Sequence, residues 1–91
     1  NLDSDYINEA YLLLGKARFY DKRFISSLQA FNYITKQEKT SEVWYEANFW
    51  KALINSNLGQ KNLANAIINQ AINKESIPDE NKSKLYIIMS I

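Results

Sequence analysis

A single glycine inside an apolar helical run constrains the fold of this chain most strongly. Gly15 follows Leu14 in that run, and Ser27, Phe31 and Ile34 recur at helical spacing in the next segment. Glycine and serine leave room for two helices to cross closely, and Phe31 and Ile34 are large enough to fill the space around the contact. The pattern therefore predicts two antiparallel helices, with Gly15 against the second helix and Ser27 facing it.

A second copy of the pattern follows later in the chain. Ala52 stands where Gly15 stood, 37 residues further on, and the small, aromatic and final small positions become Ala64, Ile68 and Ala71. A turn is expected at Leu58-Gly59-Gln60. The polar connector Lys36–Thr40 accommodates the surplus over a shorter repeat. The chain is therefore predicted to contain two helical hairpins.

The second copy departs from the first in its opening helix. Asn48 and Lys51 occupy positions where the first copy has Tyr11 and Leu14. An amphipathic helix is still predicted because five apolar residues recur at steps of three and four. They are Val43, Ala47, Trp50, Ile54 and Leu58.

The expected fold is all-α, with antiparallel hairpins stacked as a short solenoid in a single domain, 1–91. The first repeat is predicted at about residues 5–37 and the second at about 41–75. Asp3, Ser4 or Asp5 would cap a first helix ending near Tyr20, Thr40 or Ser41 would cap the third helix, and the fourth would end near Lys74. Pro78 predicts the start of a further helix, about 78–90, which would be a cap or part of a third repeat. A terminal strand over 85–91 is the competing prediction.

The amino-acid composition excludes most catalytic and metal-binding mechanisms. The 91 residues contain no histidine, no cysteine and only two glycines, so common general bases, metal ligands, thiol nucleophiles and phosphate-binding loops are missing. We expect no catalytic, cofactor-binding or metal-binding residues. The acidic pairs Asp3 with Asp5 and Asp79 with Glu80 are interpreted as helix-start residues. With a net charge of +1 and no cluster of basic residues, the sequence does not indicate nucleic-acid binding. No apolar run is long enough for membrane insertion by this segment.

The first copy resembles the tetratricopeptide repeat, a helix-turn-helix unit of about 34 residues. The matching residues are Tyr11, Leu14, Gly15, Phe24, Ser27 and Phe31, with Ile34 in place of the usual final alanine. The resemblance implies a protein or peptide partner bound in a concave groove lined by the first helix of each repeat. It assigns Glu9, Leu12, Lys16 and Phe19 to this groove from the first repeat, and Glu46, Phe49, Leu53 and Ser56 from the second.

The family's chaperone-binding members hold a C-terminal carboxylate with Lys and Asn at groove positions. Leu12 and Phe49 stand where that Lys would be, and Lys16 and Leu53 where the Asn would be. The expected ligand is therefore an amphipathic helix or an apolar peptide segment. An alternative is that further helices of a parent protein cover these residues.

The aromatic residues divide between core and surface. Tyr11, Phe24 and Phe31 are predicted to be core, because their repeat positions face the neighbouring helix. Four others stay open between core and partner contact: Phe19, Tyr20, Trp44 and Phe49.

A closer resemblance covers about a third of the chain. The segment Glu9–Phe24, especially Asp21-Lys22-Arg23-Phe24, and the segment Ala30-Phe31-Asn32-Tyr33-Ile34 are similar to the repeat region of a large lipoprotein of the Bacteroidota type IX secretion and gliding machinery. This resemblance implies a segment at the periplasmic face of the outer membrane that contacts another secretion component. The missing initial Met and the apolar end at Leu85–Ile91 lead us to expect a piece of a larger protein.

Three functions follow from these expectations. The first is a non-catalytic protein-protein interaction scaffold. The second is a structural spacer with no binding groove of its own, and the third is an accessory segment of an enzyme whose active site lies outside this sequence.

Overall fold

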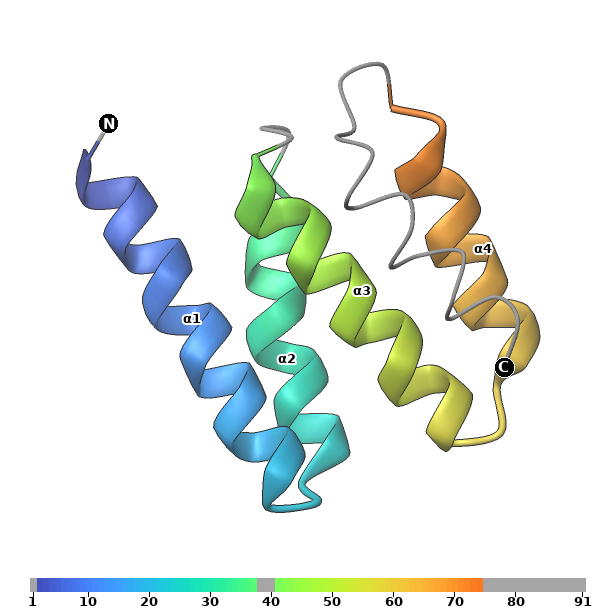
Figure 1. The fold of residues 1–91 in the computed structure, drawn as a ribbon. Helices are drawn as coiled ribbons and strands as arrows, with labels where there is room; N and C mark the ends of the chain where they lie inside the picture. Colours follow the sequence, from blue (N-terminus) through green and yellow to red (C-terminus); the bar gives the residue numbers. More distant parts are fainter. Residues whose placement is uncertain (1, 38–40, 75–91) are drawn as a thin grey trace.

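The computed structural model describes residues 2–37 and 41–74, and this part of the chain is helical. The helices are α1 (Leu2–Tyr20), α2 (Phe24–Thr35), α3 (Glu42–Asn57) and α4 (Lys61–Ile72). α1 packs with α2 and α3 packs with α4 as two hairpins, and α3 also packs on α2 (Figure 1). The predicted all-α fold of helical hairpins is confirmed, with no strand among the described residues.

The contact between α1 and α2 is built around Gly15. A Cβ atom at this position would lie 2.6 Å from the Phe31 ring, so α2 approaches closer than any larger residue would allow. The hydroxyl of Ser27 donates a hydrogen bond of 2.7 Å to the carbonyl of Gly15. Both Ser27 and Phe31 are fully buried, at 0% exposure. The predicted nesting of these residues is confirmed.

The second hairpin repeats this contact with different side chains. Ala52, Ala64 and Ile68 stand 37 residues after Gly15, Ser27 and Phe31, and all three are buried. They form one apolar cluster with Ala71, Trp44 and Tyr45. Two alanines and an isoleucine therefore replace glycine, serine and phenylalanine at equivalent positions.

The turns of the hairpins are also equivalent. Lys22 and Gly59, again 37 residues apart, both have positive φ, at 61° and 79°. In each turn the amide of the following residue, Arg23 or Gln60, donates to the carbonyl five positions back, at 2.9 and 2.8 Å. This arrangement closes a helix with a residue in the left-handed region, which favours glycine.

Some predicted helix ends need correction. α1 begins at Leu2, so Asp3, Ser4 and Asp5 lie in its first turn and not before it. Acidic residues suit that position because the first turn carries the positive end of the helix dipole. The Ser41 side chain accepts a hydrogen bond of 3.2 Å from the Trp44 amide and caps α3 as predicted.

Other predicted ends lie at the C-terminal side. α4 ends at Ile72, two residues before the predicted Lys74. The predicted helix at 78–90, like the alternative strand at 85–91, lies outside the described residues.

A second apolar cluster, which we call the three-helix cluster, joins the hairpins. It contains Leu12 from α1, Phe31 and Ile34 from α2, and Ala47 and Ile54 from α3. Val43 and Trp50 pack against it, so four of the five predicted α3 stripe residues are confirmed in the core. Leu58 is the exception, because it follows the last residue of α3 and is 40% exposed.

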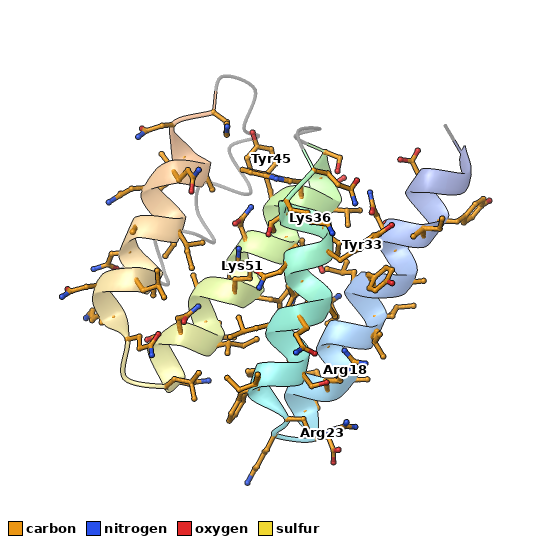
Figure 2. All side chains as sticks on the ribbon, turned by 180° about the vertical axis from the view of Figure 1, so that it is seen from behind. Arg18, Arg23, Tyr33, Lys36, Tyr45 and Lys51 are labelled. Atoms are coloured by element: carbon orange, nitrogen blue, oxygen red, sulfur yellow. The ribbon has the colours of Figure 1, made fainter. Side chains whose placement is uncertain are left out.

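The two residues that break the repeat pattern in α3 both have hydrogen-bond partners. The Asn48 amide donates 3.1 Å to the carbonyl of Trp44. Lys51 lies between α3 and α2 (Figure 2), and its ammonium donates 3.0 Å to the hydroxyl of Thr35. Burial lowers the pKa of Lys51 below its usual value, because a low-polarity environment disfavours the charged form.

Candidate protein-binding groove

Two rows of side chains, one on α1 and one on α3, were predicted to form a single groove. The spacing of three and four residues puts each row on one side of its helix. The rows meet at an ion pair in which the Lys16 ammonium lies 2.8 Å from a carboxylate oxygen of Glu46. The structure therefore brings these two predicted residues together from different hairpins.

The ion pair lies at the surface and contributes little to stability. The side chains of Lys16 and Glu46 are 32% and 30% exposed. Such exposed pairs contribute about 0–1 kcal/mol. Lys16 also lies 5.8 Å from the centre of the Trp50 ring, within the range of a cation–π contact. The two opposite charges therefore neutralise each other where the α1 row and the α3 row meet.

Phe19 is half-buried at the end of α1. Its ring meets the edges of Phe24 at 5.7 Å, Tyr20 at 5.4 Å and Trp50 at 5.2 Å between centroids. These edge-to-face contacts hold the ring in place while part of it stays accessible. Phe19 and Tyr20, left open by the sequence, thus belong to an aromatic cluster at the groove end, and Tyr20 is 73% exposed.

The α3 row is partly exposed along its length. Phe49 and Leu53 are half-buried and pack against the α3–α4 core cluster. The Phe49 ring meets Trp50 edge-on at 5.8 Å. Ser56, also half-buried, lies in the last turn of α3. Phe49 and Leu53 therefore show one side to the core and one to the surface.

Leu12 has a different position from the one predicted. It is only 4% exposed and belongs to the cluster that joins α1, α2 and α3. The repeat position was interpreted as an open groove position, but packing of α3 beside α1 covers this side chain. Glu9, the fourth residue of the α1 row, is exposed.

Trp50 is the groove residue that the sequence did not assign. It was predicted only as part of the α3 stripe, yet its ring contacts Phe19, Phe31, Phe49 and the Lys16 ammonium. A tryptophan inside an amphipathic stripe is usually interpreted as core, and nothing in the spacing indicates that it also reaches the neighbouring first helix. Trp44, in contrast, is 6% exposed, so it is a core residue.

The described residues hold no group of three acidic, histidine or cysteine side chains arranged for a metal ion. Within the same ranges, no helix is long and apolar enough to cross a bilayer.

The fold defines a helical protein of stacked hairpins. Comparisons with protein-family models, with curated proteins and with solved structures gave no match for this chain.

Proposed function

We propose that this chain is a non-catalytic protein-binding scaffold. The binding surface, called the groove strip, consists of Glu9, Lys16, Phe19, Glu46, Phe49, Leu53 and Ser56. The observation that carries the proposal is the Lys16–Glu46 ion pair of 2.8 Å, since it places the α1 row and the α3 row in contact with each other.

The ligand that fits the groove strip is an amphipathic helix or an apolar peptide segment. Phe19, Phe49 and Leu53 supply aromatic and aliphatic surface that is anchored on one side by the core. Anchored aromatic side chains are the residues that contribute most to binding energy at protein interfaces. The Lys16 ammonium is already paired with Glu46, so it favours an apolar ligand face over a terminal carboxylate.

We also propose that the hairpins are tetratricopeptide repeats. The close contact among Gly15, Ser27 and Phe31 supports this assignment, because these are the residues that match the family pattern in the first copy. The equivalent buried residues Ala52 and Ala64 support the second repeat.

The proposed partner is a component of a bacterial secretion and gliding assembly, reached at the periplasmic face of the outer membrane. This part rests on the sequence resemblance around Asp21–Phe24 and Ala30–Ile34. Fractionation of the source cells with an antibody to this chain tests it. Recovery with the outer membrane, together with secretion components after cross-linking, is expected. Recovery in the cytoplasm would contradict it.

The groove strip is tested with a library of amphipathic helical peptides selected against the chain by phage display. Binding of the selected peptides is then mapped by amide chemical shifts. Shifts are expected along the groove strip on α1 and α3. Shifts confined to α4, or no selected peptide, would contradict the assignment.

A matched pair of variants separates binding from folding. Ser56→Arg introduces a long side chain into the groove strip at a half-buried serine, whereas Asn69→Arg makes the same charge change at an exposed position of α4. Ser56→Arg is expected to weaken peptide affinity at least tenfold, which corresponds to about 1.4 kcal/mol. Asn69→Arg is expected to leave affinity unchanged. Equal affinities for both variants would favour the spacer function.

A further inference from the structure

The outward side of α1 is an exposed apolar surface. Its three most exposed large apolar side chains are Tyr6 at 71%, Leu13 at 65% and Tyr20 at 73%. Ala10 and Ala17 lie between them at helical spacing and are also exposed. These five residues form what we call the outer face of α1. α1 lies at the edge of the array, and no described helix covers this side (Figure 1).

The equivalent positions in α3, one repeat length further along the chain, are buried or half-buried. Adding 37 to Tyr6, Ala10, Leu13 and Ala17 gives Val43, Ala47, Trp50 and Ile54. All four of these α3 residues belong to or pack against the cluster that contains Phe31 and Ile34 of α2. Ala47 and Ile54 are 0% exposed. The α3 face that packs on α2 is therefore the repeat equivalent of the outer face of α1.

The 37-residue shift is a structural equivalence and not only an alignment. It relates Gly15, which lies against Phe31, to the fully buried Ala52, and it pairs the two positive-φ turn residues, Lys22 and Gly59. Interfaces that recur at the repeat length are the way in which hairpin arrays bury their apolar surface. The outer face of α1 continues the series to which the α2–α3 interface belongs.

We propose that the outer face of α1 is the docking surface for the second helix of another hairpin of this same repeat, stacked ahead of α1. In the established interface, α2 occupies the equivalent place ahead of α3, and its Phe31 ring lies parallel to Trp50, 6.1 Å away. Leu13 replaces Trp50 on α1, so the docking helix needs an apolar side chain at that point.

The side-chain hydrogen bonds of the α2–α3 interface have no equivalent on the outer face of α1. The Trp44 ring nitrogen donates 3.1 Å to the carbonyl of Thr35, and Lys51 donates to the Thr35 hydroxyl. On α1 the equivalent residues are Ile7 and Leu14, which donate nothing. The docking helix therefore receives no side-chain hydrogen bond at its equivalent of Thr35.

A second copy of this chain fits the outer face less well. Its α2 is already covered by its own α3. Its α4 has Lys61 and Asn65 at the positions of Phe24 and Leu28, both of which pack against the three-helix cluster. Charged and amide side chains at those points are costly to bury. A further hairpin of the α1–α2 type carries the apolar residues that the face requires.

The test duplicates residues 1–37 ahead of Asn1, which preserves the 37-residue spacing and presents an α2-type helix to the original α1. Leu13→Ser is then compared with Ile25→Ser in the original copy. These are matched controls, because Leu13 is 65% and Ile25 is 66% exposed in the present chain and both lie in helices.

In the present chain both variants are expected to change the melting temperature by less than about 4 °C, as for exposed substitutions. In the extended chain, Leu13→Ser is expected to lower the melting temperature by roughly 10 °C, because a buried leucine is lost. Ile25→Ser stays exposed there and is expected to change the melting temperature no more than it does in the present chain. Equal shifts for the two variants in the extended chain would overturn the proposal.

A second measurement covers the case in which the extended chain does not fold. A peptide of residues 21–37, the α2 sequence, is added at millimolar concentration to the isotope-labelled chain of 91 residues. Amide shifts at the outer face that disappear in Leu13→Ser support the proposal. Shifts absent from that face overturn it. Sedimentation showing a dimer of the present chain that Leu13→Ser abolishes would assign the face to a second copy, and would also overturn it.

Discussion

Replacing Gly15 with alanine tests the contact on which the first hairpin depends. The added Cβ would lie 2.6 Å from two atoms of the Phe31 ring and 2.9 Å from a third. Phe31 is 0% exposed and stacks on Trp50, so its ring has little room to move. Overpacking of this kind costs about 1–3 kcal/mol. Displacement of α2 would also strain the bond from Ser27, a further loss of about 1 kcal/mol.

Helix propensity acts in the opposite direction. Alanine is favoured over glycine inside a helix by about 1 kcal/mol. The expected result for Gly15→Ala is therefore a net destabilisation of about 1–3 kcal/mol, or roughly 8–16 °C in melting temperature for the centre of that range.

Urea unfolding followed by helical circular dichroism measures this change. Ala17→Gly is the matched control, because Ala17 is an exposed position of the same helix and reports the propensity difference alone. Gly15→Ala combined with Phe31→Leu should recover part of the loss, since the smaller side chain makes room. A stabilisation by Gly15→Ala equal to the loss in Ala17→Gly would refute the packing argument.

Four further results are expected in unfolding experiments. Lys22→Gly should stabilise the chain by about 0.5–1 kcal/mol, because the positive φ at this position suits glycine; an unchanged stability would contradict the turn geometry. Leu12→Ala should cost about 2–5 kcal/mol and its exposed neighbour Leu13→Ala less than about 0.5 kcal/mol, and similar losses would contradict the core position of Leu12. Ser27→Ala should cost about 1 kcal/mol because its buried hydrogen bond to the Gly15 carbonyl is lost, and an unchanged stability would contradict a contribution from that bond. Lys51 has a lowered pKa in the folded state, so the unfolded chain holds its proton to higher pH; the stability of the parent relative to Lys51→Met should rise as the pH increases toward 10.5, and a fall would contradict the burial of Lys51.

The first hairpin was predictable because its key residues favour a single structure, a close crossing of two helices. A glycine in an apolar helical run, followed at helical spacing by Ser27 and Phe31, indicates a close crossing, and the structure contains it. Helix ends were less predictable. Acidic residues suit the first turn as well as the cap, so Asp3 and Asp5 do not determine where α1 begins.

The groove was predictable only in part. Repeat positions assign Lys16 and Glu46 to neighbouring rows, and the two side chains form an ion pair, but the repeat positions do not report how closely α3 lies against α1. That distance decides that Leu12 is buried and that Trp50 reaches the aromatic cluster. Both depend on packing between hairpins, which residue spacing within one helix does not describe.

The way in which the apolar clusters share α3 has a consequence for partial opening of the molecule. α3 contributes to both clusters, whereas α4 packs only against α3 among the described helices. Detachment of α4 would leave the three-helix cluster intact, but loss of α3 would remove residues from both clusters. In native-state amide exchange, the amides of α4 should therefore exchange through a smaller opening, with a lower free energy, than those of α3.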